Sequence, residues 1–238
     1  MLNGLYAAAA GLQAQQDRLD ALANDVANVN TTGYKRARLS FHDLVYQGTG
    51  TVRRGAGAAI DPEGRSWRQG GLQETGNPLS VALDGPGFFQ VRRADGTTAL
   101  TRDGSFTIDA TGVIVTGGGE RLEPSITLPA GTQPNDVSIG PDGAVTVAGT
   151  AVGTIEVVDV PARAGLEAVG DTLFLPTTAS GQPVAAATTM RQGYLEGANV
   201  DIGEAMVGVL EAQRATEMVS RALRTQDTLL DIANGIRR

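Results

Sequence analysis

The chain has 238 residues, of which 41% are apolar, so it is long enough to bury a hydrophobic core in one large domain or two smaller ones. Its formal net charge is -7 and it has no dense stripe of lysine or arginine, which argues against a nucleic-acid partner, because phosphate binding requires a basic face. The absence of cysteine excludes disulfides, thiolate metal sites and cysteine nucleophiles.

A long helix is predicted over residues 3–29. Apolar residues recur at intervals of seven, with a second series three positions later, which is typical of a helix with one apolar seam. The two series are Leu5, Leu12, Leu19 and Val26, and Ala8, Leu22 and Val29. Asn30, Thr31, Thr32 and Gly33 follow and favour a turn that ends the helix. A helix with such a seam needs a partner.

An arm follows the first helix. Residues 34–46 are predicted to be a short extended or helical segment, and residues 47–68, rich in glycine and arginine, a loop or an irregular hairpin. A loop of this length is unusual inside a compact domain. We therefore expect the arm to become ordered on a neighbouring molecule.

Short strands separated by turn signals are predicted in the central part of the chain. Asp-Gly pairs at 84, 95, 103 and 142, and Thr111-Gly112, are hairpin-type turns. The predicted strands are residues 79–83, 88–92, 99–101, 106–108, 113–115, 126–128, 137–139, 145–147, 152–160, 172–175 and 189–195. Short runs at this spacing are typical of an all-β sandwich or a partly closed barrel.

A second helix is predicted to begin near residues 199–201, capped by Asn199 or Asp201, and to end at Asn234-Gly235. Its apolar series are Ile202, Val209, Thr216, Leu223 and Leu230, and Ala205, Ala212, Val219 and Ala233. Because both helices repeat at the same interval, we predict that they pair as a coiled coil. The predicted fold class is α+β, with long N- and C-terminal helices and an all-β central domain.

The predicted domains are a terminal helical domain at 1–30 and 199–238, an extended arm or linker at 31–70, and a β-rich domain at 71–198. A further stripe of small or apolar residues lies on the second helix at Gly208, Ala215, Ala222, Leu229 and Ile236. A pair of helices needs one seam each, so this stripe indicates additional partners; alternatively it packs on the β-rich domain. The residues expected at the subunit interface are Leu5, Leu12, Leu19, Leu22, Val26, Val29, Ile202, Val209, Val219, Leu223 and Leu230.

No motif in the sequence supports an enzyme. His42 is the only histidine, it lacks a neighbouring nucleophile pattern, and with Asp43 it shows no recognisable metal-ligand spacing. The aspartates beside glycines could be imagined as paired carboxylates for glycoside hydrolysis, but Asp-Gly is a strong hairpin signal. We expect no catalytic residue, no cofactor and no metal site. No run approaches the roughly 20 apolar residues that span a bilayer.

Residues 23–35 resemble the amino-terminal signature of the axial proteins of the bacterial flagellum. The residues that carry the resemblance are Asn24, Asn28, Asn30, Gly33, Tyr34 and Lys35, with Thr32 where proline is frequent. Near the C-terminus, Gln213 and Arg214 resemble the matching element, with Thr216 in place of the usual aromatic residue. Residues 79–91, 101–106 and 193–200 are similar to the β-rich domain of the rod proteins. The resemblance covers nearly the whole chain.

The resemblance implies a non-enzymatic structural subunit of the flagellar basal-body rod, which polymerises into the axial drive shaft and transmits torque from motor to hook. The distal-rod type fits best. The proximal-rod type stays open, because residues 47–68 form a shorter arm than a distal-rod protein is expected to have. An alternative from another class is a soluble carbohydrate-binding or hydrolytic β-domain with a helical dimer handle.

The implied partners are copies of the chain itself, adjacent rod, hook and ring proteins of the flagellum, and the flagellar export apparatus. Neither nucleic acid nor membrane insertion is expected. The implied location is the periplasmic rod. A cleavable signal peptide is not expected, because no basic residue precedes Arg18 and the apolar seam continues past Ala7 to Ala10.

Overall fold

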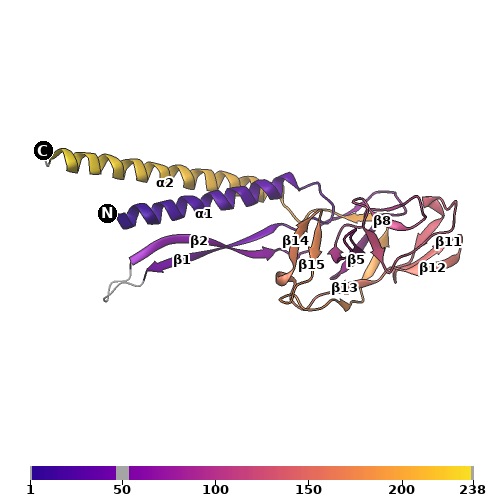
Figure 1. The fold of residues 1–238 in the computed structure, drawn as a ribbon. Helices are drawn as coiled ribbons and strands as arrows, with labels where there is room; N and C mark the ends of the chain where they lie inside the picture. The colour runs from indigo at the N-terminus through magenta and orange to yellow at the C-terminus, as the bar shows by residue number, and fades with distance from the viewer. Residues whose placement is uncertain (1, 47–53, 237–238) are drawn as a thin grey trace. The chain divides into compact units, whose positions relative to one another are not determined.

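The computed structural model describes the chain except residues 1, 47–53 and 237–238 (Figure 1). The chain divides into two compact units. The helical unit comprises Met1–Ala27, Ala37–Glu63 and Asp201–Arg238, and the β-rich unit comprises Asn28–Arg36 and Gly64–Val200. Each unit is described separately below.

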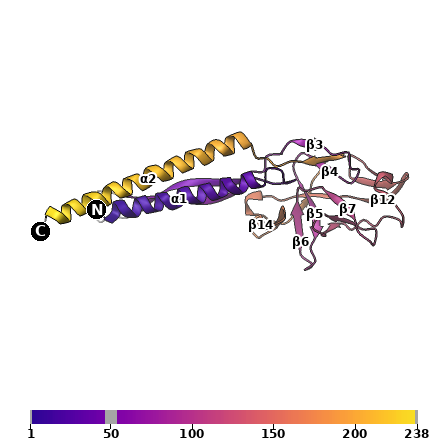
Figure 2. The same ribbon diagram turned by 90° about the horizontal axis from the view of Figure 1, so that it is seen from above.

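The helical unit contains two long helices, α1 (Leu2–Ala27) and α2 (Ile202–Ile236), as the sequence predicted. They lie side by side and run in opposite directions (Figures 1 and 2). The Arg18 guanidinium of α1 forms an ion pair of 3.1 Å with the Glu211 carboxylate of α2. One turn further along, the Leu22 side chain lies against Gly208.

Small residues allow the two helices to approach closely. Ala14 on α1 and Ala205, Gly208 and Ala212 on α2 are all buried. Gly208 was expected in the further stripe for additional partners, yet it contacts Leu22 of the same chain. The reason is the helical period of 3.6 residues, which places positions 205, 208 and 212 on one face, whereas the seven-residue repeat assigned 208 to a different series from 205 and 212.

The ends of the helices differ slightly from the prediction. Helix α1 ends at Ala27, two residues earlier than expected. The backbone N–H of Glu204 donates to Asp201 Oδ1 at 3.0 Å, so Asp201 caps α2. Helix α2 continues one residue past the expected stop at Asn234-Gly235, because glycine also tolerates helical geometry and a sequence signal fixes a helix end only to within a residue or two.

A hairpin completes the helical unit. Strands β1 (Ala37–Tyr46) and β2 (Arg54–Arg65) pair as a two-stranded sheet. The sequence left residues 34–46 as either extended or helical, and most of them form a strand. The strands are joined by an ion pair between Arg38 and Glu63 and by a contact between His42 Nδ1 and Asp61 Oδ2, each at 3.2 Å. The hairpin runs beside α1 (Figure 1), where the Asp25 carboxylate accepts the Ala37 N–H at 3.1 Å.

The β-rich unit contains sixteen named strands that begin within it. They are β3 (Leu72–Glu74), β4 (Val81–Asp84), β5 (Phe88–Arg92), β6 (Thr98–Thr101), β7 (Phe106–Ile108), β8 (Ile114–Thr116), β9 (Arg121–Glu123), β10 (Val137–Ile139), β11 (Ala144–Val147), β12 (Thr150–Thr154), β13 (Val157–Asp159), β14 (Glu167–Gly170), β15 (Leu173–Leu175), β16 (Val184–Ala185), β17 (Thr189–Gln192) and β18 (Tyr194–Glu196). Two 3-10 turns lie at Pro134–Asp136 and Arg163–Gly165.

The largest sheet has nine strands in the order β14-β15-β6-β5-β9-β8-β7, and β13 pairs with both β5 and β16. Strands β10, β11 and β12 form a separate sheet, and the pairs β17 with β4 and β18 with β3 form two more. The registered pairs in this unit are antiparallel. Short connections require this of consecutive strands such as β5 and β6, whereas the pairs β17 with β4 and β18 with β3 join distant parts of the chain.

Two clusters of buried side chains form the core of the β-rich unit. The larger one joins residues of β4, β5, β8 and β9 to β10, β11 and β17, and includes Val81, Phe89, Phe106 and Leu122. In the smaller one, the Trp67 ring packs edge-on against Phe88 and Phe174, with ring centroids 5.3 Å and 5.0 Å apart.

Several strand predictions were wrong in detail. Residues 126–128 form no strand, because only Thr127 makes an isolated bridge, to Val113. The run predicted at 152–160 is broken after Thr154, where the Ile155 N–H donates to Gly143 O, and the run at 189–195 is broken at Gly193, which has a φ of 82°. Strands β3, β9, β14 and β16 were not predicted; each has only two to four residues.

Two helical glycines provide a matched test of the close helix contact. Glycine costs a helix about 1 kcal/mol relative to alanine. A Cβ at Gly11 of α1 meets nothing within 4 Å, whereas a Cβ at Gly208 lies 3.1 Å from Leu22 Cδ1. We expect Gly11→Ala to increase the helicity of the chain and the temperature at which the helices melt, both measured by circular dichroism at 222 nm. Gly208→Ala should increase both quantities by less. An equal gain at both positions would contradict the close contact.

Candidate functional site

The segment that follows α1, residues 28–36, crosses the β-rich unit and is called the incoming segment below. Its first turn is closed by the Thr31 N–H, which donates to Asn28 O at 3.0 Å. The Gly33 N–H donates to Glu196 O at 2.8 Å, and Thr32 Oγ1 lies 2.9 Å from Asp103 Oδ1. Gly33 has a φ of +68°, and a Cβ on it would lie 2.6 Å from Asp103 N. Only glycine fits this turn.

Beyond the turn, Lys35, Arg102 and Glu196 meet in the interior and form what we call the buried charge cluster. Lys35 Nζ donates to Glu196 Oε1 at 2.5 Å and to Arg68 O at 2.9 Å. Arg102 donates to Glu196 Oε2 at 3.1 Å and to Gly85 O at 2.7 Å. The Gly70 N–H also donates to Glu196 Oε1, at 2.9 Å. The side chains are only 1%, 4% and 0% exposed, respectively.

The buried charge cluster contains two cations and one anion. Burial lowers the pKa of Lys35, the nearby Arg102 charge adds to this effect, and Glu196 opposes it. Burial likewise lowers the pKa of Arg102. The Arg102 guanidinium also lies 5.6 Å from the centre of the Phe88 ring, which favours its charge. Removal of one member of such a buried pair typically costs about 3 to 5 kcal/mol, because the remaining charge is left uncompensated.

Asn199 joins the incoming segment to the segment that leaves the unit, residues 193–200, called the outgoing segment below. Its amide nitrogen donates to Ser66 O at 2.7 Å and to Arg68 O at 2.9 Å, and its Oδ1 accepts the Arg36 N–H at 2.8 Å. Asn199 was one of the two caps considered for the second helix. The structure assigns the cap to Asp201, because the amide of Asn199 is already engaged in these three contacts.

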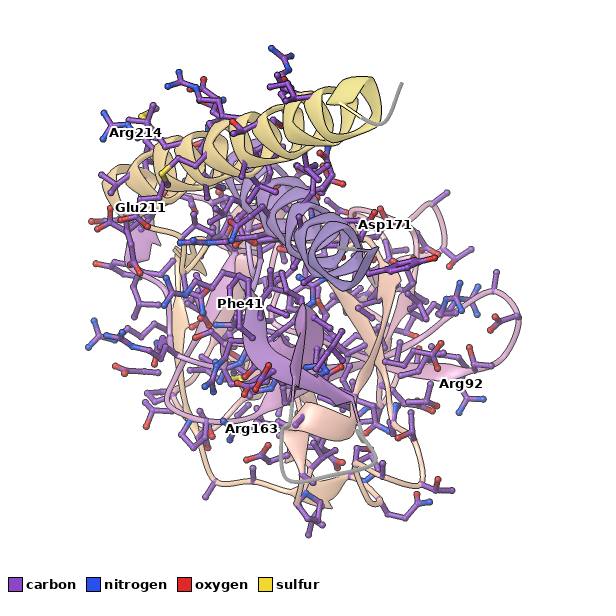
Figure 3. The ribbon with its side chains drawn as sticks, turned by 90° about the vertical axis from the view of Figure 1, so that its left-hand side faces the viewer. Phe41, Arg92, Arg163, Asp171, Glu211 and Arg214 are labelled. Carbon is purple, nitrogen blue, oxygen red and sulfur yellow. The ribbon has the colours of Figure 1, made fainter. Side chains whose placement is uncertain are left out.

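The residues of the flagellar resemblance divide between the two units. Asn28, Gly33, Tyr34 and Lys35 lie in the incoming segment, and the last three are buried. Asn30 is exposed. Asn24 is exposed on α1, and Gln213 and Arg214 are exposed on α2, where Arg214 projects away from the helix (Figure 3).

The predicted interface residues are mostly half-buried in the single chain. This group comprises Leu12, Leu19, Leu22 and Val26 on α1, Val29 in the β-rich unit, and Val209, Val219 and Leu223 on α2. Ile202 is 46% exposed. The side chains of Leu5 and Leu230 lie outside the described residues. Nothing in a single chain tests whether these residues contact another copy.

A second apolar face of α2 was missed by the sequence prediction. Met206, Val207, Leu210 and Met218 are between 54% and 65% exposed. Ile202, Met206, Leu210 and Met218 follow a spacing of four residues along the helix, interrupted at Arg214, and Val207 lies next to this row. Counting only the seven-residue repeat concealed this face, although a search at intervals of four would have found it. Exposed apolar residues grouped in this way are typical of a surface that binds another molecule.

The described residues offer little for catalysis. Among them, no three histidine, cysteine or acidic residues gather as metal ligands, and no described helix is both long and apolar enough to cross a membrane. An open pocket of about 600 Å³ in the β-rich unit is lined by Asp142 and Glu156 and otherwise by threonine, alanine and aliphatic residues. His42 is half-exposed and pairs with Asp61.

Comparisons with known proteins identify the class of protein. Three family models match: "Flagella basal body rod protein" at residues 5–35, "Flagellar hook protein FlgE/F/G D1 domain" at 82–147, and "Flagellar basal body rod FlgEFG protein C-terminal" at 191–236. These segments cover α1 with the incoming segment, much of the β-rich unit, and the outgoing segment with α2. The architecture is therefore that of the axial rod and hook proteins of the bacterial flagellum.

Full-length relatives make the assignment specific. The chain is 39% identical to the flagellar basal-body rod protein FlgG of Borreliella burgdorferi, with all of both chains covered, and 39% identical to FlgG of Agrobacterium fabrum, with 98% of both covered. It is 32% identical to FlgF of Caulobacter vibrioides, over 94% of this chain and 93% of that protein. The chain belongs to the FlgG family of flagellar basal-body rod proteins, which confirms the resemblance seen in the sequence.

Gly33 and Gly76 have the same φ of +68° and allow the turn to be tested. Alanine pays about 1 to 2 kcal/mol for this conformation at either position. At Gly76 the Cβ meets nothing within 4 Å, whereas at Gly33 it collides with the Asp103 backbone. We expect Gly33→Ala to accelerate amide hydrogen exchange throughout residues 28–36, and Gly76→Ala to leave it nearly unchanged. Similar exchange rates in both variants would contradict the claim that the turn at Gly33 requires glycine to avoid the Asp103 backbone.

Proposed function

We propose that this chain is a non-enzymatic structural subunit that polymerises with copies of itself into the flagellar rod, the axial shaft that transmits torque from motor to hook. The observation that carries the proposal is the full-length similarity to FlgG, combined with the apolar face of α2 that the single chain leaves exposed. We assign it to the distal part of the rod, because FlgG proteins match it with up to 39% identity and the matching FlgF with 32%.

We propose that α1 and α2 pair as a coiled coil. The ion pair between Arg18 and Glu211 and the contact between Leu22 and Gly208 support an antiparallel register. From the first contact to the second, the residue number rises on α1 and falls on α2. The buried alanines at 14, 205 and 212 permit a short distance between the helix axes. Within this pair, the half-buried leucines and valines of the predicted interface remain partly accessible to further helices.

The second apolar face of α2 is proposed to contact a neighbouring copy. Met206, Leu210 and Met218 project from the side of α2 that α1 leaves exposed, because each retains more than half of its accessible surface. Burial of these three side chains would contribute about 1.5 to 3 kcal/mol each. Arg214 lies within the same row and is suited to pair with an acidic residue of the neighbour.

The domain division predicted from the sequence, with a terminal helical domain at 1–30 and 199–238, an arm at 31–70 and a β-rich domain at 71–198, is proposed for the rod. In the single chain, residues 37–63 group with the helices and residues 28–36 with the β-rich unit. In the rod, the adjacent rod, hook and ring proteins would be further partners, and the export apparatus would deliver the chain to the periplasm. The proposal of these partners rests on the family resemblance.

Electron microscopy of the purified protein at high concentration tests whether the chain polymerises. Tubes support the proposal, and discrete dimers at every concentration would refute it.

Three aspartate substitutions on α2 distinguish the two helix contacts. Leu223→Asp should prevent assembly by breaking the helix pair, and it should also lower helicity in the dilute chain. Leu210→Asp should prevent assembly without lowering helicity, since Leu210 is 54% exposed before assembly. Thr225→Asp adds the same charge at an exposed polar position and should assemble normally. Sedimentation measures assembly, and circular dichroism measures helicity.

The Leu210→Asp result decides the role of the exposed face. Normal sedimentation of that variant would remove Leu210 from the contact between copies. In all three variants the β-rich unit should stay folded, which the emission of Trp67, the only tryptophan, reports through its packing against Phe88 and Phe174. The same reasoning applies to Leu12→Asp on α1, which should behave as Leu223→Asp does.

Assembly should increase the helix content. Ordering a helix of 26 residues costs on the order of 30 to 50 kcal/mol at about 1 to 2 kcal/mol per residue, and among the described side chains of the helix pair no large apolar one is fully buried. The terminal helices should therefore be only partly helical in dilute solution and complete their folding in the polymer. Circular dichroism at 222 nm should be more negative, per residue, in the polymer. Equal signals would contradict coupled folding and assembly.

A further inference from the structure

We propose that the incoming segment is a latch, which opens and closes on the β-rich unit independently of the hydrophobic core and controls access to the only lysine of the chain, Lys35. This inference concerns the folding of one chain. It does not depend on whether the chain polymerises.

The first argument is the kind of contact that holds the segment. Gly33 and Tyr34 exchange backbone hydrogen bonds with Glu196 and Asn199, at 2.8 Å and 3.3 Å. Lys35 adds its ion pair with Glu196, and the Lys35 carbonyl accepts Arg65 NH1 at 2.7 Å. Tyr34 is the one large apolar side chain of the described segment that is buried. Directional polar contacts therefore dominate the attachment, and these are lost together when the segment moves away.

The second argument is the position of the core. Among the described residues, both core clusters are built from positions 67–190 and include none from the incoming or outgoing segments. The outgoing segment pairs through β18 with β3 in a sheet of its own, separate from the nine-stranded sheet. Release of the incoming segment would consequently leave the core side chains packed. Segments with few buried apolar contacts open at lower free energy than the core of the same protein.

The third argument is the charge balance of the closed state. Glu196 neutralises Lys35 and Arg102 together, and it is the only carboxylate that contacts either of them in the hydrogen bonds and ion pairs of the described residues. When the latch opens, Lys35 returns to water and Glu196 keeps its ion pair with Arg102. Replacement of Glu196 by glutamine keeps the shape but leaves two buried cations facing a neutral amide. Opening would relieve the repulsion, so this variant should favour the open state.

The sequence supplies its own reporter, because Lys35 is the only lysine among 238 residues and its side chain is 1% exposed when the latch is closed. Acetylation of this amine by N-acetoxysuccinimide, quantified by peptide mass spectrometry against free Nα-acetyl-lysine amide in the same tube, measures opening of the latch. Amide hydrogen exchange of strands β5 and β6, measured in parallel, reports the core.

In a urea series on the unaltered full-length chain, we expect acetylation of Lys35 to rise at least tenfold at urea concentrations where β5 and β6 are still fully protected. In the absence of urea, Glu196→Gln should increase the acetylation rate at least tenfold with protection of β5 and β6 unchanged. The matched control is Asp84→Asn, which makes the same change at an exposed ion pair with Arg191 and should leave the rate unchanged.

Two results would overturn the proposal. If acetylation of Lys35 follows the loss of protection in β5 and β6 at every urea concentration, the incoming segment and the core unfold as one unit. The second result is either of two outcomes for Glu196→Gln, an unchanged acetylation rate of Lys35 or a loss of protection from β5 and β6. Either outcome would show that the buried charge cluster does not hold the latch closed independently of the core. The urea series on the unaltered chain gives a decision even when the variant does not fold.

Discussion

The Glu196 carboxylate is the group on which the joining of the incoming and outgoing segments to the rest of the β-rich unit depends. It accepts hydrogen bonds from Lys35, Arg102 and the Gly70 backbone, three groups that come from distant parts of the chain. A buried carboxylate is tolerated only when its charge is paired and its oxygens are satisfied. Lys35 comes from the incoming segment, Arg102 follows β6, and Glu196 itself belongs to the outgoing segment. The Glu196 side chain is therefore satisfied only when these three segments are correctly placed.

The helical unit follows an opposite principle. Ala14, Ala205, Gly208 and Ala212 are the buried residues at the contact between α1 and α2, whereas Met206, Leu210 and Met218 of α2 are more than half exposed. A helix pair built in this way gains little from burial within one chain, but it presents an extended apolar surface. In a member of the FlgG family, the helices would consequently gain much of their stability from contact with neighbouring copies.

The sequence predicted elements whose signals are local. The two helices follow from apolar periodicity, the Asp201 cap from its position, and strands such as β5 and β7 from alternation between Asp-Gly turns. The hairpin of β1 and β2 was left open, because residues 34–46 fitted either an extended or a helical segment and residues 47–68 are glycine-rich without a clear period. The buried charge cluster was out of reach: Lys35 was singled out through the family resemblance, but Lys35 and Glu196 are 161 positions apart and Arg102 and Glu196 are 94 apart. Each of these charges looks like an ordinary surface charge in isolation.

The hairpin holds an exposed ion pair that responds to ionic strength. The side chains of Arg38 and Glu63 are exposed, and their attraction is screened over about 8 Å at physiological salt. The ion pairs of Glu196 are excluded from solvent and are screened far less. A rise in salt concentration would therefore weaken the exposed pair of the hairpin and leave the ion pairs of Glu196 in place, so the two ends of the Lys35 to Arg38 stretch respond differently to the electrolyte around the protein.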